Sequence, residues 1–323
     1  AAYVNSPASM FGHTLLRIDG RGTDKGRGGS GLLAYAVNFA AETTESNGLI
    51  FAVKGLTGGY NGSFSLLPYY EKIKEYVRME SRDVWEYPLS LSPTEVQAVM
   101  AHVWELRGAH ADYYFFDRNC SYQLLALIEA VLPQYDLVKH FGLWAIPSDT
   151  VRVARAAGLA QTPDFRPSFT SSLRHQLDSL SVEEQDWVMR LAQADTVQAT
   201  GFDGKQGLSQ LADSGLSKTQ QARILQVATD WLYLQTLSGF IDRSQALPHS
   251  HAMLSTRSVL GAQPSFTPVP KPTTAPDEGH ASGRTQFAIV SDPTNTSKND
   301  DLALDIQLRP AYHDLLDDAA GFV

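Results

Sequence analysis

Short apolar stretches with alternating polar positions dominate the first ninety residues of the chain. Four of these stretches predict strands, at residues 13–18, 32–40, 49–56 and 84–91. Glycine-rich segments interrupt them. Residues 20–31 predict a long hairpin loop, and residues 55–64 (GLTGGYNGSF) predict a mobile lid over a site. We therefore expect a small antiparallel sheet with a flexible rim.

Helical periodicity replaces this alternation after residue 91. The sequence SPTE at 92–95 has the form of a capping box with proline at the first helical position, and it predicts a helix that ends near residue 107. Apolar residues at helical spacing predict a second helix from Cys120 to Leu132, which Pro133 ends. Strands followed by helices predict an α+β fold.

Two further regions follow these helices. From residue 163 only helical patterns occur, with helices expected at 169–180, 182–195, 206–213 and 217–238. Residues 263–283 are rich in proline and predict an extended linker, and residues 285–292 and 301–316 alternate as strands do. We predict three regions, at 1–162, 163–262 and 263–323. Because Ala1 is not a methionine and the final strands lack obvious partners, we expect the natural protein to be longer.

Composition excludes several classes of partner. The chain has 323 residues, of which 43% are hydrophobic, so it is expected to fold around a sizeable core. A formal net charge of -9 argues against a nucleic-acid partner, which needs a concentrated Lys/Arg surface. No apolar run approaches eighteen residues, so no membrane-spanning helix is predicted. Any membrane association is expected to depend on sequence outside residues 1–323.

The single cysteine, Cys120, is the first candidate for chemistry. One cysteine excludes an intramolecular disulfide and any zinc site built from several cysteines. Cys120 stands at the predicted start of a helix, where unpaired N–H groups and the helix dipole lower the pKa of a thiol. A free cysteine is also often buried and inert. The polar neighbours favour the nucleophile over this alternative; they are Asp117, Arg118, Asn119 and Ser121.

His13 is the candidate base for this nucleophile. It stands at the Gly-His entrance to the first predicted strand, where Gly12 lets a main chain or a substrate approach closely. A half-buried strand histidine bonded to a neighbour is the alternative. Because the second strand would lie antiparallel to the first, Asn38 is a candidate third residue that orients the imidazole ring. A simple position at a sheet edge or turn stays open for Asn38.

An oxyanion and a substrate need further contacts. The backbone N–H of Cys120 is one oxyanion donor by its position, and the side chains of Asn5, Ser6 and Asn119 are candidates for another. Tyr60, in the predicted lid, is a candidate contact for the substrate.

No cofactor and no metal ion is expected. The remaining histidines have neither an HExxH motif nor a cysteine cluster beside them, and the chain has no GxSxG elbow and no P-loop. His249 and His251 are therefore interpreted as ordinary polar residues rather than metal ligands.

Five separated motifs carry a resemblance to a known family. In chain order they are NSPASMFGHTLLRI, AYAVNFAAE, KGLTGGYNGSFSLLPYYEKIKEY, ESRDVWEYPLSLSPTEV and YYFFDRNCSYQLL. Together they cover most of residues 1–160, and the sequence resembles the Lnb N-terminal periplasmic domain family. The resemblance implies a circularly permuted papain-like core in which the histidine strand precedes the cysteine helix. It also implies a catalytic Cys120 with His13, and a periplasmic or outer-membrane-associated location in a Gram-negative cell envelope.

Three functions follow from these expectations. The first is a thiol acyltransferase or hydrolase acting on an acylated lipid or lipoprotein, since the Gram-positive acyltransferases of this family move an acyl chain within a lipoprotein. The second is a cell-wall amidase or peptidase with the same Cys-His dyad. The third is a non-catalytic periplasmic domain docked to an outer-membrane barrel. An apolar surrounding of Cys120 favours the first, a polar groove the second, and a sulfur far from any imidazole the third.

Overall fold

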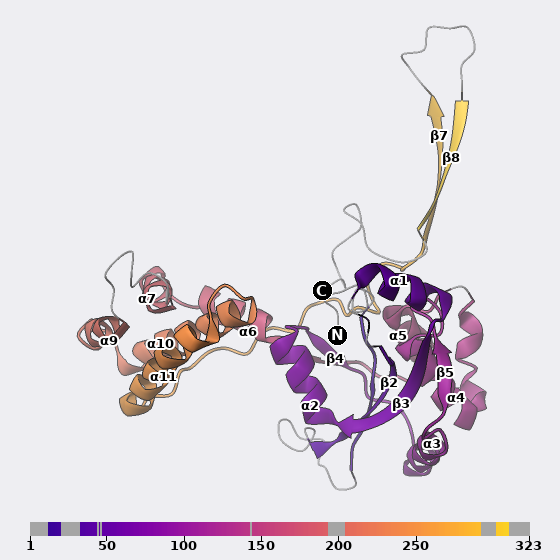
Figure 1. Ribbon diagram of the computed structural model, residues 1–323, viewed down its shortest axis with the longest axis horizontal. Helices are drawn as coiled ribbons and strands as arrows, with labels where there is room; N and C mark the ends of the chain where they lie inside the picture. Colours follow the sequence, from indigo (N-terminus) through magenta and orange to yellow (C-terminus); the bar gives the residue numbers. More distant parts are fainter. Residues whose placement is uncertain are drawn as a thin grey trace. The chain divides into compact units, whose positions relative to one another are not determined.

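The computed structural model describes residues 12–20, 33–43, 45, 47–142, 144–192, 204–291 and 302–309. The chain forms two compact units, coloured along the sequence in Figure 1. Unit 1 comprises residues 1–166 and 272–323, and unit 2 comprises residues 167–271. The last predicted region, 263–323, is therefore divided, because its first nine residues group with the helical unit and the rest groups with unit 1.

A four-stranded antiparallel sheet organises unit 1. Its strand order is β1-β2-β3-β5, and the strands are β1 (Leu16–Ile18), β2 (Tyr35–Ala41), β3 (Tyr60–Pro68) and β5 (His110–Tyr113). The strands predicted at 13–18 and 32–40 are confirmed as β1 and β2. They are hydrogen-bonded neighbours, with Leu16 opposite Val37, so the chain that precedes β1 runs beside the end of β2.

Helices cover both faces of this sheet (Figure 1). Successive residues of a strand point to opposite faces. Val37 packs against α3 (Pro93–Glu105) and α4 (Cys120–Val131), whereas its neighbour Ala36 packs against α2 (Tyr69–Ile73). The capping box predicted for α3 is present, and α4 begins at the predicted residue. The mixed α+β class is thus confirmed.

Residues 49–56 form a helix, and the predicted strand there is wrong. Helix α1 spans Gly48–Thr57, and the side chain of Asn47 accepts hydrogen bonds from two backbone N–H groups of its first turn. Gly58 ends the helix with a φ of 75°. A short apolar run fits either a strand or a helix. The cap residues at both ends decide for the helix.

The glycine-rich segment 55–64 is also not a lid. Its first residues close α1, and from Tyr60 it becomes β3, a strand with neighbours on both sides. A Cβ atom built on Gly62 would lie 2.4 Å from the ring of Phe39, so this glycine lets an aromatic ring lie flat on the sheet. The glycines of this segment therefore serve close packing rather than flexibility.

The rest of unit 1 surrounds this core. It consists of the π-helical segment η2 (Lys74–Met79), β4 (Val84–Glu86) paired with β6 (Asp164–Arg166), the short turns η3 (Pro133–Tyr135) and η4 (Val138–His140), α5 (Pro147–Ala156), and the hairpin of β7 (Arg284–Ser291) and β8 (Leu302–Arg309). Strands predicted at 285–292 and 301–316 correspond to β7 and β8, and residues 292, 301 and 310–316 lie outside the described residues.

Part of the predicted linker at 263–283 is held firmly on unit 1. The segment has no helix or strand. Arg152, on α5, donates hydrogen bonds to the carbonyl oxygens of Asp277 and His280, and the Asp277 carboxylate accepts hydrogen bonds from Tyr87 and Arg155. These bonds fix the residues that lead into β7.

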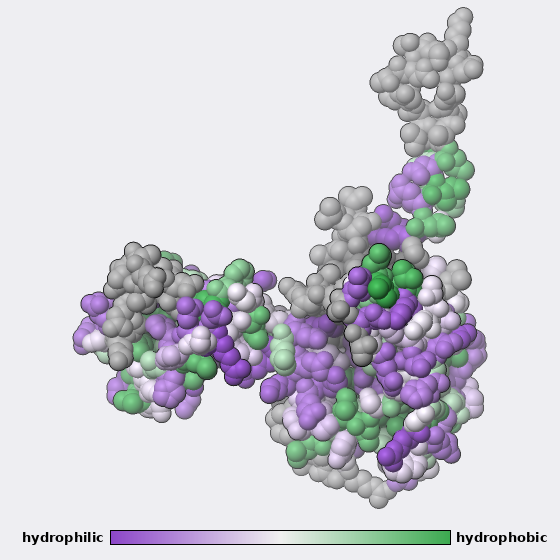
Figure 2. Space-filling model, viewed as in Figure 1, coloured by the Kyte–Doolittle hydropathy of each residue, from purple (hydrophilic) through white to green (hydrophobic). Residues whose placement is uncertain are grey.

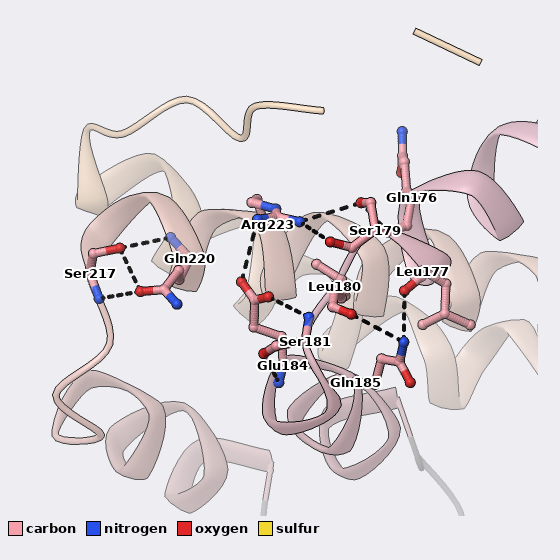
Figure 3. A network of polar contacts seen from close by, with 10 residues as sticks. All are labelled: Gln176, Leu177, Ser179, Leu180, Ser181, Glu184, Gln185, Ser217, Gln220 and Arg223. Atoms are coloured by element: carbon pink, nitrogen blue, oxygen red, sulfur yellow. Dashed lines mark hydrogen bonds and ion pairs between the residues drawn. The ribbon is translucent and has the colours of Figure 1, made fainter. Parts of the chain in front are cut away.

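Unit 2 is helical, as predicted. Its helices are α6 (Phe169–Asp178), α7 (Val182–Ala192), α9 (Gly204–Ala212), α10 (Lys218–Leu237) and α11 (Arg243–Leu260). The core consists of aliphatic residues of α10 packed against α6, α7 and α11. Figure 3 shows how polar contacts join the helix ends: Arg223 donates to the carbonyl oxygen of Ser179, and Ser217 and Gln220 form a capping box. Among the described residues, none of the helices combines the length and the apolar composition that crossing a membrane requires.

Candidate functional site

Cys120 is the first residue of α4, and Asn119 is its N-cap. The side-chain oxygen of Asn119 accepts hydrogen bonds from the backbone N–H groups of Ser121 and Tyr122. Its amide nitrogen donates to the carbonyl oxygens of Phe115 and Ala145. Both amide protons are therefore committed, and the prediction of Asn119 as an oxyanion donor does not fit this geometry. Asn119 instead fixes the helix start that carries the sulfur.

His13 reaches the thiol from the extended segment that precedes β1. Gly12 has a φ of 83°, a conformation that residues with a side chain rarely adopt, and it directs the chain into this position. The Nε2 atom of His13 lies 2.7 Å from Oδ1 of Asn38, on the neighbouring strand β2. The imidazole also lies close enough to Cys120 that each of the two groups shifts the pKa of the other. The structure thus brings Cys120, His13 and Asn38 together.

Cys120 and His13 each stabilise the charged form of the other. Burial raises the pKa of the Cys120 thiol, but the nearby His13 and hydrogen bonds from its ring, from the backbone N–H of Thr14 and from the hydroxyl of Tyr113 lower it, to about 7 overall. Burial lowers the pKa of His13, and the interactions with Cys120 and Asn38 raise it above its ordinary value overall. A thiolate next to an imidazolium is the state that these contacts favour.

Tyr113, at the end of β5, is a site residue that the sequence did not reveal. Its hydroxyl is one of the groups that lower the pKa of the Cys120 thiol, and burial of the ring is the main cause that raises the pKa of Tyr113 itself. The ring stacks on Phe39 at a centroid distance of 5.7 Å and an interplanar angle of 12°. The signal in the sequence is the aromatic run that begins seven residues before the cysteine, and it gives no indication of which ring turns toward the sulfur.

Tyr76 is a second residue found only in the structure. It lies in the π-helical segment η2, and its ring centroid is 5.8 Å from that of His13. Lys72 and Arg82 place their cationic groups over the Tyr76 ring at 5.6 and 5.8 Å. π-helical turns are rare in proteins, and those that occur are often at functional sites. Here it packs a buried ring against the imidazole and so restricts how His13 can turn.

Tyr60 lies on β3, the strand next to β5, which carries Tyr113. It is the cross-strand partner of Tyr113 in the β3–β5 pair, and its ring packs against Phe51 of α1. Within the described part of the chain, its buried hydroxyl has no hydrogen-bond partner. Tyr60 is thus part of the aromatic layer next to the site. The other two predicted contacts, Asn5 and Ser6, lie outside the described residues.

A row of aromatic rings leads from Tyr113, whose hydroxyl is near Cys120, to helix α1. Phe39, Tyr113 and Phe115 form a chain of ring contacts that α1 extends through Phe51. On its outer side α1 exposes four aliphatic side chains, which are visible as a green area over this helix in Figure 2. They are Leu49, Ile50, Val53 and Leu56. The Cys120 side chain itself is only 3% exposed.

No group of three or more His, Cys, Asp or Glu side chains that could hold a metal ion occurs in the described ranges.

Family models match three successive parts of the chain. Residues 1–157 match the family model of the Lnb N-terminal periplasmic domain. This match gives the protein a periplasmic or cell-envelope location, and the Lnb region contains Cys120, His13 and Asn38. Residues 163–269 match a domain of unknown function (DUF7842), and residues 273–323 match another (DUF7840). The chain has no match among curated proteins or among solved structures.

Proposed function

We propose that this protein is a thiol enzyme of the cell envelope that transfers or hydrolyses acyl groups. Cys120 is the nucleophile, His13 is the general base and acid, and Asn38 orients the imidazole ring. The observation that carries the proposal is the position of His13, whose Nε2 lies 2.7 Å from Oδ1 of Asn38 and whose ring is near enough to Cys120 to lower the pKa of the thiol. A thiol, an imidazole and an orienting amide at the start of a helix are the arrangement that an activated nucleophile needs.

The reaction would proceed in two steps. The Cys120 thiolate attacks the carbonyl carbon of an ester or amide, a C–S bond forms, and the carbonyl electron pair moves to oxygen. When this intermediate collapses, the leaving alkoxide or amine takes the proton from the His13 imidazolium, and a thioester on Cys120 remains. An incoming amine or water then gives its proton to His13 and attacks the thioester, which releases the thiolate.

The surroundings of the thiol support an apolar acyl group as substrate. The aromatic residues beside Cys120 and the exposed aliphatic face of α1 offer few polar partners to a sugar or a cell-wall peptide. An acyl ester or amide of a lipoprotein or phospholipid, in the periplasm, fits this chemistry best. The proposal includes the permuted papain-like core that the resemblance implies, and the order of His13 before Cys120 in the chain supports it.

The single cysteine makes the test direct, because alkylation of the chain reports on one thiol. The rate of iodoacetamide alkylation, followed by intact mass between pH 5 and 9, should rise through a midpoint near pH 7. In His13→Ala the midpoint should move to 9 or higher. At pH 7 this shift lowers the thiolate fraction, and with it the rate, by roughly 50-fold. His102→Ala, which removes a half-buried histidine on α3, is the matched control.

Acylation tests the second part of the proposal. Incubation with p-nitrophenyl octanoate should add one octanoyl group to the wild-type chain, on Cys120, and none to Cys120→Ser. Two results would refute the enzymatic proposal. One is an alkylation midpoint near pH 9 in the wild type, and the other is a wild-type thiol that is alkylated but never acquires an octanoyl group from p-nitrophenyl octanoate.

A further inference from the structure

We infer that the buried hydroxyl of Tyr60 is a hydrogen-bond donor for the acyl substrate and binds one of its acceptor oxygens. This inference rests on the proposed function of Cys120 and adds to it a substrate-binding residue. The sequence predicted Tyr60 as a substrate contact on a mobile lid. The structure instead gives the residue a fixed position on β3, a strand with hydrogen-bonded neighbours on both sides.

The hydroxyl of Tyr60 is a donor that the fold does not use. Tyr60 is only 5% exposed, and its buried hydroxyl oxygen has no hydrogen-bond partner among the described residues. A buried polar group without a partner destabilises the folded protein, so native proteins contain few of them. A substrate that brings an acceptor oxygen to this position would supply the missing partner.

The side chain is held by groups that do not accept its proton. The Tyr60 ring centroid lies 5.8 Å from that of Phe51, which in turn packs on Phe115 at 5.0 Å. The ammonium group of Lys54 lies over the Tyr60 ring, 5.7 Å from its centroid, and an ammonium group donates hydrogen bonds but accepts none. These contacts fix the ring in place without satisfying the hydroxyl.

Tyr60 projects from the face of the sheet on which the cysteine helix packs. It lies directly opposite Tyr113, and residues opposite each other in an antiparallel pair project from the same face with their Cβ atoms about 5 Å apart. Phe64, four residues further along β3 and therefore on the same face, packs in one cluster with Leu124 of α4. The side chain of Tyr60 thus lies on the side of the sheet that carries α4, the helix that begins at Cys120.

A surface hollow of about 240 Å³ borders Tyr60. Residues of α1, of β3 and of the segment after β2 line it: Glu42, Glu45, Lys54, Gly59, Tyr60 and Asn61. The aliphatic side chains exposed on the outer side of α1 belong to the same helix as Lys54. A ligand at this surface can therefore reach Tyr60, although the hydroxyl itself is buried.

Two reagents with the same octyl chain length test whether the hydroxyl binds a substrate oxygen. p-Nitrophenyl octanoate carries ester oxygens, whereas 1-iodooctane, which alkylates the same sulfur, carries no oxygen. Tyr60→Phe keeps the ring against Phe51 and removes the hydroxyl alone. In this variant, modification of Cys120 by the octanoate ester, followed by intact mass, should slow by roughly threefold to tenfold, and modification by 1-iodooctane by less than about twofold. Tyr35→Phe, which alters an exposed tyrosine of β2, is the matched control and should change neither rate.

The stability of Tyr60→Phe gives an independent readout. Because the hydroxyl has no partner in the protein without substrate, its removal should raise the midpoint of thermal unfolding, by about 2–4 °C. A hydroxyl that is bonded within the fold would have the opposite effect. A lower midpoint, or a variant that does not fold, would therefore overturn the inference.

The kinetic outcomes separate this inference from the proposed function. If the octanoate ester modifies the wild type and Tyr60→Phe at equal rates, Tyr60 does not bind the substrate and the dyad stands. Equal slowing with both reagents would also overturn the inference, because the hydroxyl would then act on the thiol or on access to it. A wild-type thiol that never acquires an octanoyl group contradicts the proposed function itself, on which the inference rests.

Discussion

In unit 2 the buried Thr229 and Gln221 bond to the nearby backbone, whereas in unit 1 the buried Asn38 bonds to a side chain 25 positions away. Thr229 donates to the carbonyl oxygen of Leu225 one turn earlier, and Gln221 donates to that of Leu216 just before its helix. A buried polar group needs a partner in either case. Local partners stabilise a helix, but a partner from another strand places one functional group next to another.

The cores of the two units differ in the same way. Unit 2 has one continuous aliphatic cluster around α10. Unit 1 divides its apolar residues among three clusters on the two faces of the sheet and around α5. The polar relay from Cys120 to Asn38 begins at one end of these clusters, at the start of α4. Unit 2 thus has a single packed core, and the residues of the proposed chemistry all lie in unit 1.

The largest expected effect comes from Leu225→Ala, which tests this division of roles. Leu225 is fully buried in α10, and removing three side-chain carbons from such a position costs about 2–5 kcal/mol. Hydrogen exchange of the α10 amides should accelerate accordingly. The alkylation rate of Cys120 should not change. Leu237→Ala, at a half-exposed position of the same helix, is the control and should have little effect. A slower alkylation in Leu225→Ala would contradict the independence of the two units.

A smaller loss of stability is expected in unit 1 from Gly62→Ala. The added methyl group would meet the Phe39 ring at 2.4 Å, so Phe39 and Tyr113 must shift, at a cost of about 1–3 kcal/mol. The midpoint of thermal unfolding measures the loss. Gly48→Ala is the control, because a Cβ atom there meets nothing within 4 Å. If both variants unfold at the wild-type temperature, the result contradicts the close packing of Phe39 and Tyr113 against Gly62.

Local signals in the sequence predicted the helices better than the site. The capping box at Ser92 and the polar turn before Cys120 act within a few residues, so α3 and α4 could be predicted with their starting points. The apolar pattern at 49–56 fits a strand as well as a helix. The capping bonds of Asn47, which identify the helix, are evident only in the structure. His13 and Asn38 could be proposed because adjacent antiparallel strands bring them together. Tyr113 could not, since its contact with the sulfur depends on how β5 pairs with β3.

A moderate effect on reactivity, with little effect on stability, is expected from Asn38→Ala. The variant removes the bond to Nε2 of His13, and a hydrogen bond of this kind contributes about 1 kcal/mol, so acylation should slow by roughly fivefold to tenfold. Because Asn38 raises the pKa of His13, that pKa should fall in the variant, as measured by the NMR shifts of the imidazole. Asn61→Ala, at an exposed position of β3, is the control. An unchanged imidazole titration would show that Asn38 does not orient the ring.

The smallest expected effect concerns the pH dependence of stability, and it again separates the two units. Burial raises the pKa of Glu86, but the hydroxyl of Tyr69 and the guanidinium groups of Arg17 and Arg166 lower it below 4.5 overall. A carboxylate with a lowered pKa in the folded state contributes stability above its unfolded pKa and loses that contribution as the pH falls through the folded value.

Glu86→Gln should therefore lower the stability of unit 1 at pH 7 by about 1 kcal/mol or less, since the group is only partly buried. The variant should also lose less stability than the wild type when the pH falls from 5 to 3. Thermal unfolding across this range, together with hydrogen exchange of the β2 and α10 amides, measures the effect in each unit. Glu105→Gln, an exposed residue of α3, is the control. Because Glu86 has its partners on β1, α2 and β6, the α10 amides of unit 2 should not respond, and a response there would show that the two units share their stability.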